Sequence, residues 1–196
     1  MGIVAGDCVE TSRIDSISYT THTTTNQLVS SNDSNKSYFK AKSDFVTKPI
    51  PQSGLEGVWE FLGEELSSFI VLAPLGGRMY EIPSIEILFP YRAGYFYNIQ
   101  YQVTWTDSSK DLAYMDWMRR FYEYMTPYVT ESPRGAYVNY IDLDLGTTIN
   151  GIASVAEARS WGDKYFGGNF DRLVKVKIKF DPNNVFRNSQ SIPMNK

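Results

Sequence analysis

The chain has 196 residues, with 19 Lys and Arg against 22 Asp and Glu, which gives a formal net charge of −3. Hydrophobic residues make up 42% and charged residues 21%, a balance typical of one large or two small folded domains. The sequence has no basic cluster for contacting phosphates and no run approaching the ~20 apolar residues of a membrane span. We therefore expect no nucleic acid and no membrane among its partners.

The cysteine and histidine content restricts the possible chemistry further. Cys8 is the single cysteine, which excludes an intramolecular disulfide and a cysteine-rich zinc site, and His22 is the single histidine, which excludes a multi-histidine metal centre. We therefore expect no metal. The usual motifs for dinucleotide, phosphate, serine-hydrolase and zinc-protease sites are absent. Composition and motifs alone name no function.

The N-terminal stretch differs in composition from the rest of the chain. Its first residues carry neither the basic region nor the long apolar region of a secretory signal peptide. Residues 20–37 are rich in Ser, Thr and Asn, which predicts an exposed loop. Asn32 and Asn35 each begin a glycosylation sequon, although such triplets arise often by chance in this composition. We expect the ordered body to begin near Tyr38.

Two elements are predicted next. Residues 54–65 carry apolar side chains at helical spacing, which predicts a helix. Residues 69–75 form a short apolar run closed by two glycines, which predicts a buried strand.

The clearest strand signal is residues 95–105. Apolar side chains alternate along it with Asn98, Gln100, Gln102 and Thr104, so one face is apolar and the other is polar. A solvated sheet face and a functional pocket both explain the polar side, and the alternation does not choose between them.

A helix is predicted over residues 108–125. Ser108 and Asp111 have the spacing of a capping box, and apolar residues cover most of the circumference that follows. Pro127 is expected to end this helix.

Residues 136–145 are predicted as a strand that follows a turn at 132–135. Asp142 and Asp144 would then share one strand face, where acid–base chemistry or a hard cation is conceivable and a solvated strand edge is favoured. Tyr137 and Tyr140 surround Asn139 in the same stretch. A phenol acts as an acid or base only when neighbours lower its pKa from about 10, and packing is the usual role of a strand tyrosine.

The C-terminal third predicts a helix that starts at a Ser154–Glu157 capping box and ends at Gly167. Residues 169–180 fit both a helix and a strand, because helical spacing and strict alternation overlap there. Strands and helices are mixed without a regular β-α-β rhythm, which favours an α+β fold.

Three long motifs and one further stretch resemble a known family. The sequence resembles the C-terminal part of the plant berberine bridge enzyme-like oxidases, a family that includes the cannabinoid synthases and the monolignol oxidoreductases. The residues that carry this resemblance are FPYRAGYFYNIQYQVTW, YEYMTPYVTESPRGAYVNYIDLDLG, WGDKYFGGNFDRLVKVKIKFDPNNVFRNSQSIP and, further upstream, SYFKAKSDFVTKPIPQSGLEGVWE.

The resemblance implies a fold and a function. Family members are secreted FAD-linked oxidases that act on alcohol, phenolic, sugar or alkaloid-type substrates with molecular oxygen as acceptor. An N-terminal module holds the flavin through one His and one Cys. A vanillyl-alcohol-oxidase-type module, an antiparallel sheet backed by helices, covers the flavin ring and forms the substrate pocket.

On this resemblance, residues 1–133 belong to the substrate-binding domain, and residues 134–196 form the berberine-bridge-type C-terminal segment that returns to the FAD module. Cys8 and His22 match no flavin attachment site. We therefore expect this chain to lack the FAD module and its covalent anchor. We also expect a location outside the cell or in the cell wall.

The resemblance assigns roles to a tyrosine-rich signature. Tyr140 aligns with the tyrosine proposed as the catalytic base of cannabinoid synthases, and Tyr137 and Asn139 lie beside the flavin ring in the family. Ideal strand alternation would put Tyr140 on the opposite face from the other two. The three residues reach one flavin only if the strand bends or ends there.

Further assignments fall on the strand at 95–105 and near the C-terminus. Gln100 takes a catalytic pocket position, Asn98 lines the substrate pocket where relatives often carry Lys or Glu, and Asn184 is expected to bind the cofactor. Ile141 and Tyr91 depart from the usual Arg and His of the family. The alternative to an oxidase is therefore a catalytically inactive truncated family member or an allergen-like surface protein.

Overall fold

The computed structural model describes residues 12, 15, 37–65, 67–148 and 152–194. The chain divides into two units, residues 1–36 and 37–196, and the elements and contacts described here lie in the second. The predictions made for Cys8, His22, Asn32 and Asn35 lie outside the described residues. No helix in the described part is long and apolar enough to cross a membrane.

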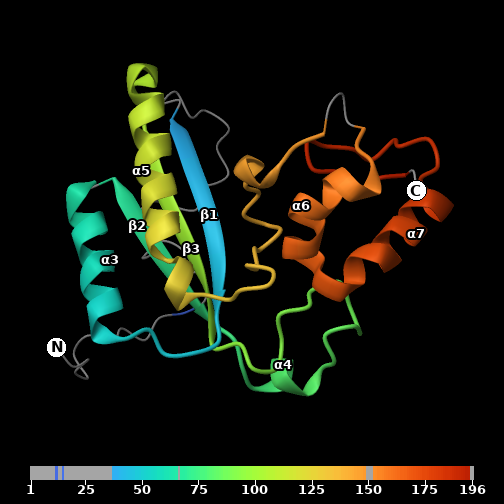
Figure 1. Cartoon of the computed structure of the whole chain (residues 1–196), viewed down its shortest axis with the longest axis horizontal. Helices are drawn as coiled ribbons and strands as arrows, with labels where there is room; N and C mark the ends of the chain where they lie inside the picture. Colours follow the sequence, from blue (N-terminus) through green and yellow to red (C-terminus); the bar gives the residue numbers. More distant parts are fainter. Residues whose placement is uncertain (1–11, 13–14, 16–36, 66, 149–151, 195–196) are drawn as a thin grey trace. The chain divides into compact units, whose positions relative to one another are not determined.

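The second unit contains a three-stranded antiparallel sheet (Figure 1). Strand β3 (Tyr97–Trp105) is central and pairs with β1 (Tyr38–Val46) on one side and β2 (Ser68–Pro74) on the other. Because the strands are antiparallel, side chains directly opposite each other share a face. Together with the helices that pack against the sheet, this confirms the predicted α+β fold.

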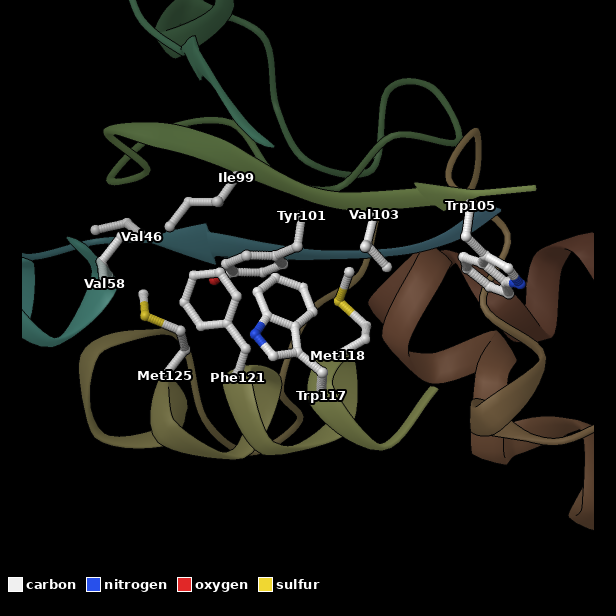
Figure 2. Packing of buried hydrophobic residues seen from close by; sticks show 10 residues of the cluster. All are labelled: Val46, Val58, Ile99, Tyr101, Val103, Trp105, Trp117, Met118, Phe121 and Met125. Atoms are coloured by element: carbon white, nitrogen blue, oxygen red, sulfur yellow. The ribbon is translucent and has the colours of Figure 1, made fainter. Parts of the chain in front are cut away.

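The apolar face of β3 packs against helix α5 (Asp111–Tyr124), as Figure 2 shows. Tyr101 and Val103 of the strand are almost fully buried, as is Phe121 of the helix. Helix α3 (Gln52–Glu64) contributes Phe61, whose ring stacks on Phe121 with centroids 4.9 Å apart. Alternation along β3 therefore determines the core, as its sequence predicts.

The start of α5 corrects a prediction. Asp107, not Ser108, caps this end: its Oδ1 accepts a hydrogen bond from the Ser109 N–H at 3.0 Å, ahead of a 3₁₀ turn at Ser108–Lys110. The carboxylate of Asp111 instead accepts a hydrogen bond from Trp105 Nε1 at 2.5 Å. The predicted capping box is wrong because its acidic partner is engaged by the end of β3.

Strand β2 is present where predicted, but it is not buried. It lies at an edge of the sheet, and Phe69, Val71 and Leu72 are each between 41% and 53% exposed. An apolar run alone does not distinguish a central strand from an edge strand, and here it misled. A short helix α4 (Arg78–Glu81) follows β2.

Helices α6 (Val155–Phe166) and α7 (Phe170–Phe180) form a second hydrophobic cluster. The predicted capping box of α6 is confirmed: Ser154 Oγ accepts from the Glu157 N–H, and Glu157 in turn accepts from the Ser154 N–H. The ambiguous segment is helical because Phe170 and Val174, four residues apart, are both buried in this cluster.

The predicted strand at 136–145 is wrong. The Tyr140 N–H donates to the Tyr137 carbonyl at 2.9 Å to close a turn, and a 3₁₀ turn follows at Leu143–Leu145. Side chains take the place of a neighbouring strand: Ser43 Oγ accepts from the Tyr137 N–H at 2.8 Å, and Tyr165 Oη accepts from the Asp142 N–H at 3.0 Å. The side chains alternate in the sequence, but among the residues that the structure describes no neighbouring strand pairs with this segment.

A buried ion pair ties this segment to the sheet. Arg134 Nε and one terminal nitrogen each donate to a carboxylate oxygen of Asp44 at 2.6 Å, and the guanidinium lies 3.4 Å from the ring centroid of Tyr122. Burial raises the pKa of Asp44 to about 6, and Arg134 opposes this without cancelling it.

The packing of α3 on α5 predicts opposite effects of one substitution at two glycines. A Cβ at Gly57 would overlap the Tyr124 ring, whereas a Cβ at Gly63 meets nothing within 4 Å. We expect Gly57→Ala to lower the free energy of unfolding by about 1–3 kcal/mol through overpacking. The matched control Gly63→Ala should raise it by up to about 1 kcal/mol, because alanine favours the helix. Urea unfolding measures both; equal stabilisation by both would contradict the contact.

The Asp44 pair predicts a pH dependence. Because the pKa of Asp44 is about 6 when folded and 3.8 in the unfolded reference, the folded state binds the proton more tightly. This contribution to stability is complete below about pH 4 and is lost as the pH rises through 6, about 3 kcal/mol in all. Urea unfolding should show the free energy of unfolding of the wild type falling relative to that of Asp44→Asn as the pH rises from 4 to above 6. A wild type that gains stability relative to Asp44→Asn over this range would contradict the prediction.

Candidate functional site

The polar face of β3 supplies the first part of the candidate site. Gln100 lies opposite Ser43 of β1 and Val71 of β2, so these three side chains belong to one face. Gln100 is half-buried, and its Nε2 donates to Gln102 Oε1 at 3.1 Å. This face therefore offers amide groups beside an exposed apolar strand edge.

Asn98 lies on the same face, one pair further along the strand. Its side chain is buried, and its Nδ2 donates to the Asp44 carbonyl at 2.9 Å. One amide hydrogen is thus committed to the backbone of β1. A role of Asn98 in the substrate pocket stays a prediction.

The Tyr137–Tyr140 turn brings the tyrosine signature together. The Tyr137 and Tyr140 rings meet edge to face with centroids 5.1 Å apart, and Asn139 Nδ2 donates to Tyr137 Oη at 2.8 Å. Asn139 is exposed and Tyr140 is half-buried. The turn removes the conflict that strand alternation posed, since all three side chains now lie in one place.

Aromatic rings connect this turn to the polar face of the sheet. Phe45, which pairs with Asn98, stacks on Tyr91 with centroids 3.6 Å apart. Phe89 packs edge to face against both Tyr91 and Tyr137. Burial raises the pKa of the Tyr91 phenol, whose hydroxyl donates to a backbone carbonyl of α6. Tyr91 therefore has a packing role.

The two aspartates after the turn do not form a solvated strand edge. Lys40 Nζ and Lys42 Nζ each donate to one carboxylate oxygen of Asp142 at 2.6 Å, and Asp144 lies 3.3 and 2.9 Å from the same two nitrogens. We call these four residues the Asp142 cradle. Lys40, Lys42 and Asp142 are buried, so the predicted solvated strand edge is wrong for Asp142, whereas Asp144 is exposed.

The cradle extends to α5. Arg119 donates to both oxygens of Asp144, at 2.9 and 3.2 Å. Burial alone would raise the pKa of Asp144, but hydrogen bonds from Arg119 and Lys42 hold it well below its usual range. Lys40 and Lys42 were not among the predicted site residues, although two lysines spaced by two on a strand share a face, which was the available signal.

Asn184 lies in a different loop, after α7. Its φ of +52° is left-handed, a conformation that asparagine tolerates better than most residues. Its N–H donates to the Asp181 carbonyl at 3.0 Å, and its carbonyl accepts from Arg187 at 3.1 Å. Cofactor binding by Asn184 stays a prediction.

A mostly apolar cavity of about 580 Å³ lies near this loop. Val138 and Ile141, which flank Asn139 and Tyr140 in the sequence, line this cavity together with Phe180 and Phe186. The signature turn thus adjoins two environments: the amide face of the sheet and this apolar cavity.

The donor set suits a flat heteroaromatic ligand. Phenol rings can pack on its faces, and the amides of Gln100 and Asn139 can both donate to and accept from a polar ring edge. These residues therefore fit the ring of a flavin. Within the described residues, no three His, Cys, Asp or Glu side chains are grouped so that they could hold a metal ion.

Comparison with known proteins identifies the relatives. The family described as "Berberine and berberine like" matches residues 136–193. Monolignol oxidoreductase AtBBE-like 13 of Arabidopsis thaliana is 48% identical over 98% of this chain and 36% of its own length. Tetrahydroberberine oxidase of Berberis wilsoniae is 49% identical over 81% of this chain and 30% of its own.

The fold agrees with solved structures of the same group. Phl p 4, a grass pollen allergen with glucose dehydrogenase activity, superposes with a TM-score of 0.88 at 35% identity, over 99% of this chain and 41% of that one. The chain spans less than half the length of each of these three proteins. Family members are FAD-binding flavoproteins. The resemblance carried by the sequence motifs is thus confirmed: over nearly its whole length, this chain is similar to part of the berberine bridge enzyme-like proteins.

Proposed function

We propose that this chain forms the substrate-facing part of an FAD-dependent oxidase that acts on small alcohol, phenolic, sugar or alkaloid-type molecules. One observation carries the proposal: the half-buried Tyr140 and the exposed Asn139 are presented on a turn that Ser43, the cross-strand partner of Gln100, holds against the sheet. Tyr140, the proposed base, is thereby anchored to β1, and Gln100, the proposed orienting amide, lies on the neighbouring strand β3.

The chemistry follows from these groups. When bound, FAD supplies a hydride acceptor that molecular oxygen regenerates. Oxidation of an alcohol also releases the hydroxyl proton, and the phenolate form of Tyr140 is the group proposed to accept it and become a phenol. Gln100 can orient the substrate hydroxyl by donating or accepting a hydrogen bond, and Asn139 steadies the Tyr137 phenol beside Tyr140.

The proposed substrates cover several classes of small molecule. The names of the relatives point to monolignols, tetrahydroberberine and glucose, which share an oxidisable carbon in a small molecule. The aromatic rings around Tyr137 and the apolar cavity beside Ile141 favour a substrate with an aromatic or otherwise apolar body.

The flavin-holding residues belong, in this proposal, to the part of the family's length that this chain does not cover. Residues 134–196 would return to that FAD module, which the match of the family to residues 136–193 supports. The exposed side chains Ile141, Phe180 and Phe186 lie in this segment.

We further propose that the protein acts outside the cell or in the cell wall. The support is the resemblance to secreted oxidases and the two sequons at Asn32 and Asn35.

Removal of one hydroxyl tests the proposed base. In a chimera, residues 37–196 replace the matching part of the Arabidopsis thaliana monolignol oxidoreductase, and flavin reduction is followed by absorbance with an aromatic alcohol. We expect Tyr140→Phe to slow reduction about 10²- to 10⁴-fold, because a positioned base is lost.

The matched control is Tyr114→Phe in α5, which removes a phenol hydroxyl from a half-buried ring that stacks on Trp105 of β3. It should reduce flavin at the parent rate. Unchanged reduction in Tyr140→Phe would remove the base assignment. A parent chimera that binds FAD but never reduces it would favour the inactive alternative.

The sequons give a separate prediction about location. Expressed in plant cells behind a secretory signal, the chain should lose mobility-shifting glycan when Asn32→Gln and Asn35→Gln are combined. Electrophoresis before and after glycosidase treatment measures this. A wild-type chain that enters the secretory pathway without glycan would contradict use of both sites.

A further inference from the structure

The signature turn is held at its N-terminal side by buried partners. The Ala136 N–H donates to the Lys164 carbonyl of α6 at 2.9 Å, and the Tyr137 N–H donates to Ser43 Oγ of β1 at 2.8 Å. Arg134, two residues before Ala136, forms an ion pair with the buried Asp44. The chain therefore enters the turn along a path fixed by two elements.

The C-terminal side is held by Asp142, which uses all of its polar groups. Its carboxylate oxygens accept one lysine each, its N–H donates to Tyr165 Oη, and its carbonyl accepts from Gln190 Nε2 at 2.8 Å. Asp142 is only 2% exposed. Its position is thus set by β1, α6 and the C-terminal loop together.

Between these two anchors the chain is open to solvent. Asn139 and Ile141 are exposed, and Tyr140 is half-buried. On the N-terminal side, Tyr140 is held by its hydrogen bond to the Tyr137 carbonyl and by the edge-to-face contact with the Tyr137 ring. On the C-terminal side, the nearest anchored residue is Asp142, two residues away.

The cradle has a geometry that resists movement of Asp142. The two lysines approach different oxygens of one carboxylate at the same distance of 2.6 Å, so rotation of the carboxylate lengthens at least one bond. Asp144 and Arg119 bring the local charge to three cations against two anions. Loss of the Asp142 charge would leave the two lysines near each other with Asp144 as the one remaining carboxylate.

We propose that Asp142, held by Lys40 and Lys42, is a positioning residue that sets the place of Tyr140. This inference rests on the proposed function for its catalytic meaning, and on the contacts above for its structural part. Tyr140 is the group that would touch substrate; Asp142 acts only through it.

Hydrogen exchange of the intact chain tests the structural part without any flavin. In Asp142→Asn, the amide oxygen can accept from one lysine, while the amide NH₂ faces the other. We expect faster exchange in the peptide covering 137–142, with β3 and α5 unchanged. The matched control is Asp116→Asn, which removes an exposed carboxylate paired with Arg120. It should leave the turn unchanged.

If Asp142→Asn does not fold, Lys40→Met provides a milder variant, because Lys42 still contacts Asp142 and Asp144. The same peptide should exchange faster. Unchanged exchange in the turn of a folded variant overturns the proposal.

The chimera described above tests the catalytic part. Asp142→Asn should slow flavin reduction at saturating substrate by about 10- to 100-fold, because a base displaced by about 1 Å loses its alignment. The dissociation constant of the substrate should not change, because Gln100 and its strand are untouched. Val58→Ala, a core substitution in α3, serves as the control for general destabilisation.

The outcomes separate the two proposals. A rate loss in Asp142→Asn no larger than that in Val58→Ala would make the role structural only and overturn the inference. If the parent chimera shows no flavin reduction, the proposed function fails, and the exchange result alone decides whether Asp142 positions Tyr140.

Discussion

The register of β1 against β3 is the constraint on which the rest of the structure depends. It places Lys40, Lys42 and Asp44 on the helix side of the sheet and Ser43 on the amide side, opposite Gln100. The first set holds Arg134, Asp142 and Asp144, while Ser43 holds the turn between them. A shift of one residue would exchange these faces and release the signature turn from both sides at once.

Periodicity predicted most of the fold because burial follows it. The alternation in β3 and the capping box of α6 are local signals, and each was sufficient. For the segment 136–145, the same reasoning predicted a strand that is not present. Its alternation is real, but its hydrogen-bond partners are the side chains of Ser43 and Tyr165, more than 20 residues away in either direction, which a local pattern cannot reveal.

The candidate site shows the same division. The tyrosine signature could be found only by its resemblance to a family, because bare chemistry assigns a strand tyrosine to packing. The lysines that hold Asp142 lie about 100 residues before it. Each charged pair taken alone looks like a solvated face; only the fold brings opposite charges together and buries them.

Helix α7 has a consequence beyond its packing. Val176, Ile178 and Phe180 are exposed in the helix. In an extended chain they would lie on one face together with Val174. Before α7 docks on α6, this stretch is a template for strand pairing between molecules. Lys175, Lys177 and Lys179 alternate with these apolar side chains and would bring like charges into register in such a pairing. Repulsion between these lysines would oppose strand pairing between molecules at this stretch.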